Sequence, residues 1–380
     1  MTTCSGIDAT TGAGTEITFN GNIESVRPGA AEPSMWIAPG WVDIQVNGFA
    51  GVDYNSAATP HEEIARSVQV QYAAGMTRFY PTVITGSPDD MLAALKNLSR
   101  AKDTLAEGSA MDGFHVEGPH ISAEEGPRGA HPKRWVRPPD IDEFRRWQDA
   151  TNGRVRLVTI APEWPQAPRY IEAVVAQNVV VSIGHTAAEA RHIADAVSAG
   201  ATMSTHLGNG AHGVMRRHPN YIWEQLAEDR LRASFIVDGI HLPGSFLKVA
   251  LRAKGVERAV LVTDASSPAG CAPGRYRLGE QDVDLTVDNR VVLAGQERLA
   301  GSALKMDRGV ENLMRLGELS LADAVRLATV NAARAGRVPG RERGLVAGER
   351  ADFVLFDFDA ATKSIKIQAT YVGGRKVWSL

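Results

Sequence analysis

The middle of the chain alternates short apolar runs with amphipathic segments, and this alternation limits the fold more than any other feature. Between most of the runs, apolar residues recur with helical spacing, as in 61–75, 88–101, 139–150, 187–200 and 244–255. Eight runs have the length of a strand, and they lie at 41–47, 77–83, 113–118, 154–163, 179–186, 203–207, 233–239 and 259–266. Strands and helices that alternate eight times predict a closed (β/α)8 TIM barrel of the α/β class.

An open doubly wound sheet is the alternative fold, because it also alternates strand and helix. A phosphate-binding loop or a dinucleotide fingerprint after the first strand would favour that fold. Residues 43–55, which read DIQVNGFAGVDYN, contain neither motif. The pattern therefore favours the barrel.

Both ends of the chain are expected to form a small β domain. Residues 17–26 place an Asn-Gly pair between alternating apolar residues, and residues 351–378 carry strand-like runs around a Gly-Gly turn. A further strand-like segment interrupts the barrel pattern after Asp264. We therefore assign residues 1–38 and 343–380 to a β-sandwich domain, and residues 39–342 to a catalytic barrel. The β excursion in the barrel lies near residues 274–299.

Length and charge exclude several classes of protein. A chain of 380 residues suffices for a barrel and a smaller domain, and a formal net charge of −3 supplies no broad field that would attract nucleic acid or an anionic membrane. No run of 18 apolar residues occurs, and the first residues lack the pattern of a secretory signal. Because only Cys4 and Cys271 are present, we expect no disulfide framework and a cytoplasmic location.

Four residues that can bind a metal or move a proton stand where an apolar run gives way to a polar turn. They are Glu117, His185, His206 and Asp264. Side chains at the ends of barrel strands project into the open mouth of the fold, where they can meet. A lone Glu at a turn is usually only solvated, and a lone His is more often a satisfied polar residue than a ligand. Three such residues in register at one mouth indicate a hydrolytic metal centre.

Asp264 has two interpretations. It can cap the segment that follows it, or it can act as a base beside a water molecule that a metal has made acidic. Under the second hypothesis, Asp264 takes a proton from the attacking water and delivers it to the departing nitrogen.

His115 is an alternative metal ligand, because strand alternation turns it to the same face as Glu117. It stands deeper than the rim, so we interpret His115 as a packing residue.

The motifs resemble those of the amidohydrolase superfamily, and within it those of enzymes that remove acetate from N-acetylglucosamine 6-phosphate. The resemblance runs from Pro39 to Asp357 and includes FHVEGPHIS, SIGHTAA, STHLGN, VDGIHLP, LVTDASSPAG and LAGSALKMDRGV. It implies a TIM barrel with a β domain built from both termini. Many superfamily members place two His at the end of the first strand for a second metal, where this chain has Gln45 and Asn47. The resemblance therefore implies one divalent ion held by residues matching Glu117, His185 and His206.

The same resemblance implies roles in substrate binding. His131 matches the residue that helps to polarise the acetyl carbonyl, and His241 matches one that contacts the sugar, although both could be surface loop histidines. In the run after His206, which the family uses to bind the sugar phosphate, Asn209 is retained, Gly208 replaces an aromatic residue and Gly210 replaces Ala. Arg217 matches an arginine that the family supplies from the neighbouring subunit, so a homodimer is expected. The RRHP segment that contains it could equally be a solvated loop.

Other functions remain open at this point. An amidohydrolase of the same fold could act on an unphosphorylated or differently configured N-acyl amino sugar, and a catalytically silent binding protein could use the same scaffold. A hydantoinase-like cyclic amidase is disfavoured, because it needs two metals and the first-strand imidazoles. Zn²⁺ is the first expectation for the ion, and Fe²⁺, Co²⁺ and Mn²⁺ also suit this donor set. We expect an amino sugar as the small-molecule partner.

Overall fold

A closed barrel of parallel strands forms the body of the protein in the computed structural model, which describes residues 1–32 and 34–380. The sheet order is β14-β13-β12-β11-β10-β9-β8-β5, and the sheet closes where the amide of Asn47 donates to the carbonyl of Ala265 at 2.7 Å. The strands are β5 (Trp41–Val46), β8 (Met76–Ile84), β9 (Phe114–Glu117), β10 (Val155–Ile160), β11 (Val180–Ile183), β12 (Met203–Ser204), β13 (Arg232–Ile236) and β14 (Ala259–Val262). The predicted (β/α)8 barrel is confirmed, and it has the predicted strands in the predicted order.

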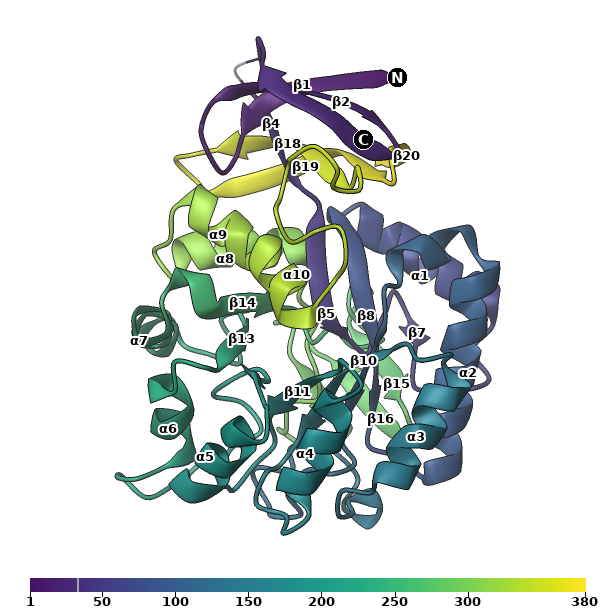
Figure 1. The fold of residues 1–380 in the computed structure, drawn as a ribbon, viewed down its shortest axis with the longest axis vertical. Helices are drawn as coiled ribbons and strands as arrows, with labels where there is room; N and C mark the ends of the chain where they lie inside the picture. The colour runs from purple at the N-terminus through teal and green to yellow at the C-terminus, as the bar shows by residue number, and fades with distance from the viewer. Residues whose placement is uncertain (33) are drawn as a thin grey trace.

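Helices surround the barrel (Figure 1), and several begin with a side-chain cap. Ser87, Asp140, Asn220 and Ser320 each accept a hydrogen bond from a backbone amide in the first turn of the following helix. The α-helices are α1 (His61–Tyr72), α2 (Pro88–Thr104), α3 (Ile141–Ala150), α4 (Ala167–Val175), α5 (Ala190–Ser198), α6 (Tyr221–Ala227), α7 (Gly244–Lys254), α8 (Met306–Arg315), α9 (Leu321–Ala328) and α10 (Val330–Gly336). Short 3-10 turns lie at Ala106–Ala110, Lys133–Trp135 and Val256–Arg258, and a small hairpin is formed by β6 (Gly48–Phe49) and β7 (Val52–Asp53).

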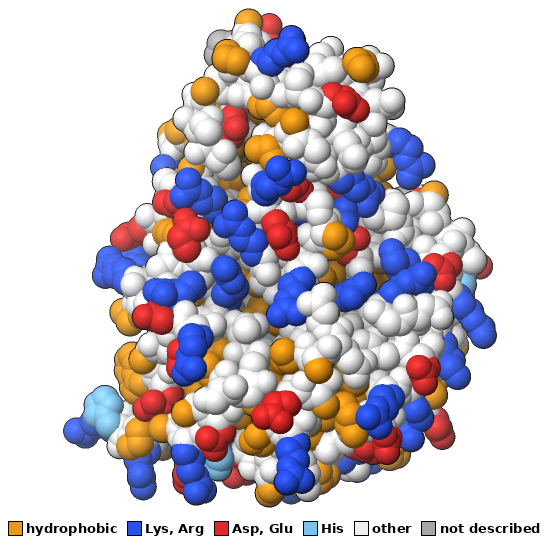
Figure 2. All heavy atoms as spheres, in the orientation of Figure 1, with side chains coloured by type: hydrophobic (Ala, Val, Ile, Leu, Met, Phe, Trp, Pro, Cys, Tyr) orange, Lys and Arg blue, Asp and Glu red, His pale blue; other side chains and the backbone are white. Residues whose placement is uncertain are grey.

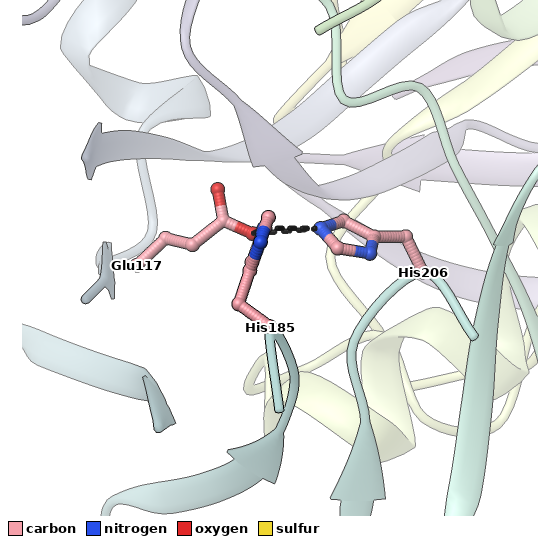
Figure 3. Close-up of side chains that lie close together, drawn as sticks. All are labelled: Glu117, His185 and His206. Carbon is pink, nitrogen blue, oxygen red and sulfur yellow. Dashed lines mark hydrogen bonds and ion pairs between the residues drawn. The ribbon is translucent and has the colours of Figure 1, made fainter. Parts of the chain in front are cut away.

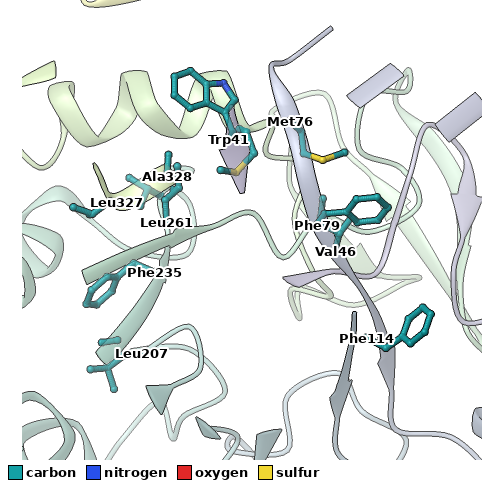
Figure 4. Packing of buried hydrophobic residues seen from close by; sticks show 14 of the residues in the cluster. Trp41, Val46, Met76, Phe79, Phe114, Leu207, Phe235, Leu261, Leu327 and Ala328 are labelled. Atoms are coloured by element: carbon teal, nitrogen blue, oxygen red, sulfur yellow. The ribbon is translucent and has the colours of Figure 1, made fainter. Parts of the chain in front are cut away.

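The barrel strands bury both of their faces. Along β14, Val260 and Val262 pack inside the barrel, whereas Leu261 packs outward in the layer between strands and helices. Figure 4 shows Leu261 and Phe235 in that outer layer, near Leu327 of α9. Because successive side chains along a strand alternate between the two layers, both are continuous hydrophobic cores, and the strand ends are held in fixed positions.

A second, smaller layer of strands covers the closed end of the barrel and contains both termini (Figure 1). Its sheet has the order β20-β19-β18-β4-β1-β2-β3, and the ring of Phe19 lies 5.0 Å from that of Phe353 and 5.7 Å from that of Tyr371. The strands are β1 (Thr2–Asp8), β2 (Gly14–Asn20), β3 (Asn22–Pro28), β4 (Met35–Pro39), β18 (Phe353–Asp359), β19 (Ser364–Val372) and β20 (Arg375–Ser379). Since β2 packs on β18 and β19, the β-sandwich built from both termini is confirmed.

A three-stranded antiparallel sheet interrupts the barrel between β14 and α8. It consists of β15 (Gly274–Leu278), β16 (Gln281–Leu285) and β17 (Val291–Leu293), and we call it the excursion sheet. Its apolar side chains pack with Ile84, at the end of β8. The excursion sheet therefore lies against the mouth of the barrel. The exact boundaries of the two domains and of this excursion stay predictions.

Figure 2 shows acidic and basic side chains interspersed on the face in view, with basic side chains gathered across its middle. Among the helices of the described residues, none combines the length and the apolar character that a bilayer-spanning segment needs.

Buried charges join the barrel to the small β domain. Asp352, whose side chain is fully buried, lies 3.0 Å from Nη1 of Arg78, and Arg78 also pairs with Asp112. Arg341 is equally buried, and its Nε lies 3.8 Å from the same Asp352 carboxylate. Asp352, which precedes β18 of the small β domain, thus neutralises Arg78 of β8 and Arg341 of the segment after α10.

Replacing Asp352 with Ala should strongly destabilise the protein, because it leaves Arg78 and Arg341 in a dry site without their shared counter-charge. We expect the free energy of unfolding to fall by about 3–5 kcal/mol, measured by urea denaturation. Asp282, which pairs with Arg277 on the surface, provides the control. An Asp282→Ala variant should lose far less stability, and equal losses in the two variants would contradict the importance of the junction.

Candidate metal centre

Three side chains, one at the end of β9 and one each just after β11 and β12, meet at the mouth of the barrel (Figure 3). Oε1 of Glu117 lies 2.9 Å from Nε2 of His206 and 3.4 Å from Nε2 of His185. The two imidazole nitrogens are 3.1 Å apart, and all three residues are buried. The residues that the sequence places at separate strand ends are therefore in mutual contact.

The backbone of this site adopts an uncommon conformation. Glu117 is the last residue of β9, whereas His185, His206 and Asp264 each follow their strand by two residues. The φ angles of these last three are 50°, 28° and 51°, in the region that residues other than glycine rarely occupy. Such conformations cost on the order of 1–3 kcal/mol each and cluster at functional sites. Here the chain turns sharply out of each strand, with the side chain aimed into the mouth.

The geometry of the cluster fits a bound cation. Ligand atoms of a tetrahedral site with bonds of about 2.0–2.1 Å lie roughly 3.3 Å apart, close to the separations among these three atoms. The Nδ1 hydrogen of His185 is assigned as a donor to the carbonyl of Pro127 at 2.9 Å, which leaves the lone pair of Nε2 directed at the cluster. Two imidazoles and one carboxylate form a donor set that suits zinc and related divalent ions.

Electrostatics favour positive charge between these residues. Burial would raise the pKa of Glu117, but its close contacts with His185 and His206 hold that pKa well below its usual range. Burial would likewise lower the pKa of His206, and the hydrogen bond with Glu117 raises it instead. The carboxylate is thus ionised and directed at a point where positive charge is stabilised.

Asp264 lies beside the cluster and is held by the amide side chains of Asn47 and Gln45. Its Oδ1 accepts hydrogen bonds from Nδ2 of Asn47 at 2.6 Å and from Nε2 of Gln45 at 3.1 Å. The same Nε2 donates to Glu117 at 2.8 Å, so Gln45 bridges the two carboxylates. Burial, and then the charge of Glu117, raise the pKa of Asp264 to about 6. The first-strand amides therefore position the site, a role that their residue type alone does not reveal.

His131 reaches the cluster from the loop after β9. Its Nε2 lies 3.3 Å from Nε2 of His185, and its Nδ1 lies 2.8 Å from the hydroxyl of Thr85. Burial lowers the pKa of His131 to about 3, so the imidazole is neutral. A neutral imidazole can donate one hydrogen bond to a substrate oxygen.

The cluster opens into a cavity of about 270 Å³. His241, Asn209 and Gly210 line it together with Asp264 and His131. Asp238 accepts a hydrogen bond from Nδ1 of His241 at 2.6 Å and from two backbone amides of the same loop. Because Asp238 orients the ring, Nε2 of His241 is the free nitrogen of this side chain.

The loop after His206 explains two departures from the resemblance. A side chain at Gly208 would place its Cβ 2.9 Å from atoms of Leu242 and Phe246, so Phe246 of α7 fills the space that an aromatic residue would need. At Gly210, where φ is +55°, a Cβ would lie 2.5 Å from Nδ1 of His185. The loop backbone therefore packs directly on a candidate metal ligand.

Two of the sequence candidates lie outside the cluster. Arg217 is exposed and is not among the residues that line the cavity of its own chain. His115 is buried, its Nε2 lies 2.7 Å from the hydroxyl of Thr159, and burial lowers its pKa to about 4. The position of His115 agrees with a packing role.

Comparisons with known proteins agree with this geometry. The model of the Amidohydrolase family matches residues 36–377. N-acetylglucosamine-6-phosphate deacetylase of Homo sapiens is 35% identical to this chain, and the match covers 90% of this chain and 83% of that protein. The deacetylase of Bacillus subtilis is 33% identical, and the match covers 85% of this chain and 81% of that protein.

A solved structure shows the same fold over the full length. The crystal structure of N-acetyl-D-glucosamine-6-phosphate deacetylase from Mycobacterium smegmatis covers 100% of both chains with a TM-score of 0.90 and 31% identity. A mutant of that protein in complex with N-acetyl-D-glucosamine-6-phosphate has a TM-score of 0.89 and 31% identity, and covers 99% of this chain and 98% of that one. This chain therefore belongs to the amidohydrolase family.

Proposed function

We propose that this protein is a metal-dependent amidohydrolase that removes acetate from N-acetylglucosamine 6-phosphate to give glucosamine 6-phosphate. The convergence of Glu117, His185 and His206 beside Asp264, in a cavity, is the observation that carries the proposal. The deacetylases named among its relatives support the choice of substrate. Glu117, His185 and His206 would hold one divalent ion, and zinc is our choice for it.

The residues of the site have distinct chemical tasks. A divalent ion bound there acidifies water and polarises an amide carbonyl. Asp264 accepts the proton of the attacking water and transfers it to the nitrogen that leaves. Both amide donors contact Oδ1 of Asp264, so Oδ2 is the oxygen we assign to proton transfer. The neutral imidazole of His131 donates to the carbonyl oxygen and stabilises the negative charge that develops on it.

The remaining lining residues would bind the sugar phosphate. His241 contacts a sugar hydroxyl, and the backbone of Asn209 and Gly210 faces the phosphate. Arg217, which is exposed on its own chain, would reach the phosphate of a neighbouring subunit in a homodimer. The free thiols of Cys4 and Cys271 suit a reducing compartment, and we propose the cytoplasm.

An alternative substrate is an unphosphorylated N-acyl amino sugar or a different epimer. The glycines at 208 and 210 favour this alternative, because they change the phosphate-binding run. Acetate release from phosphorylated and plain N-acetylhexosamines, with metal content measured on the same preparation, separates the two functions. The proposal predicts a clear preference for N-acetylglucosamine 6-phosphate, and a preference for the plain sugar would replace it with the alternative.

An Asp264→Asn variant should keep its metal and lose turnover. The amide retains the shape of the side chain but cannot accept the proton, so kcat should fall by about 10²–10⁴-fold. Acetate release and elemental analysis of the same sample test this prediction. A variant with near-normal kcat would end the assignment of Asp264 as the base.

An Arg217→Ala variant should raise KM for the phosphorylated substrate by about 10-fold or more, because a charged hydrogen bond to phosphate is lost. KM for the plain sugar should not change, and light scattering should show a dimer. Arg145→Ala, which removes an exposed arginine of α3, is the control. Two outcomes would contradict a phosphate contact made across subunits. One is an equal change in KM for the two substrates, and the other is a monomeric protein whose KM for the phosphorylated substrate does not change in the variant.

A further inference from the structure

One wall of the metal-site cavity is apolar and packs with the excursion sheet. Ile84 and Leu278 both line the cavity, and both are members of the cluster that forms the hydrophobic core of the excursion sheet. Ala130, the neighbour of His131, packs against the same cluster and also lines the cavity. We call Ile84, Leu278 and Ala130 the apolar wall.

The apolar wall stands beside the groups that act on the scissile amide. Ile84 pairs with Glu117 on the adjacent strand, so the two residues occupy the same level of the barrel mouth. Thr85, the next residue, hydrogen-bonds to His131. The candidate sugar ligands His241, Asn209 and Gly210 come from other loops, those after β12 and β13. The apolar wall is thus attached to the elements that carry the carbonyl-binding histidine and the carboxylate ligand.

Only one group of the proposed substrate suits an apolar surface. An N-acylated amino sugar phosphate presents hydroxyls, a phosphate and an amide, and its acyl tail is the only part without polar atoms. Burying that tail against aliphatic side chains removes it from water, whereas burying a hydroxyl there would cost a hydrogen bond. We infer that the apolar wall is the acyl subsite and that Ile84 and Leu278 limit the length of the acyl group. This inference rests on the proposed function.

A second cavity lies behind this wall. It measures about 350 Å³ and is lined by Ile84, Thr85, Met91 and Gly279, among others. Ile84 is therefore shared by the two cavities, and Gly279 follows the wall residue Leu278. Removing the Ile84 side chain would connect the catalytic cavity with space that a longer acyl chain could fill.

Two polar residues hold the wall from outside. The amide of Ile84 donates to Oδ1 of Asn55, and the amide of Gly279 donates to Oδ2 of Asp53, each at 2.7 Å. The amide of Asn55 also donates to Oδ1 of Asp53, at 2.9 Å. Both wall segments are thereby fixed to one short stretch, residues 53–55, at the end of β7. A fixed wall can discriminate by size, because it cannot retreat from a longer chain.

The test compares kcat/KM for N-acetyl-, N-propionyl- and N-butyrylglucosamine 6-phosphate. For the wild type we expect each added methylene to lower kcat/KM by about tenfold, the usual effect of one methylene in a fitted pocket. In Ile84→Ala and Leu278→Ala, the butyryl-to-acetyl ratio should rise by about tenfold or more. Ile84→Val, which removes only a methyl group, should shift the ratio in the same direction by less. Binding of the three compounds to an Asp264→Asn background should follow the same order.

Leu285→Ala is the matched control, since Leu285 is buried in the same cluster but does not line the cavity. Its ratio should match that of the wild type. An unchanged ratio in both Ile84 variants, or an equal rise in Leu285→Ala, would overturn the acyl subsite while leaving the proposed function in place. Failure of the wild type to release an acyl group from any N-acylated amino sugar would overturn both.

Discussion

Three atoms with lone pairs, Oε1 of Glu117 and Nε2 of His185 and His206, lie within 3.4 Å of one another in a buried site. Such an arrangement is unfavourable unless positive charge stands between the atoms, because burial removes the water that would otherwise screen them. The other features of the mouth are arranged around this requirement. Pro127 fixes the tautomer of His185, Gln45 orients Glu117, and Gly210 lets a loop pack on the imidazole of His185.

The closure of the barrel brings Asp264, the proposed base, to the three proposed metal ligands. Asp264 follows β14 and Gln45 lies on β5, so the two residues become neighbours only because these strands meet. The amides of Gln45 and Asn47 then tie Asp264 to the carboxylate of Glu117. The same closure leads the chain directly into the excursion sheet, which supplies one side of the cavity. The proposed catalytic and specificity elements thus share one structural origin.

Much of this could be predicted from residue patterns, since a strand followed by a helix leaves a strong periodic signal. The barrel strands, the β-sandwich from both termini, and the meeting of Glu117, His185 and His206 all follow from that signal and from the position of strand ends. The catalytic roles of the site residues stay predictions. The positive φ angles could not be predicted, because tertiary packing imposes them on residues that disfavour them. The bridging role of Gln45 and the position of Ile84 between two cavities could not be predicted either, because both depend on contacts between distant segments.

The most direct measurement is anomalous X-ray diffraction from crystals of the purified protein, combined with the metal stoichiometry of the same sample. We predict one cation per chain, with Oε1 of Glu117 and Nε2 of His185 and His206 as ligands at about 2.0–2.2 Å. A Glu117→Gln variant should lose the peak and keep the fold. A cation bound elsewhere, or full activity in crystals and solutions free of metal, would contradict the claim that these three side chains form the reactive centre.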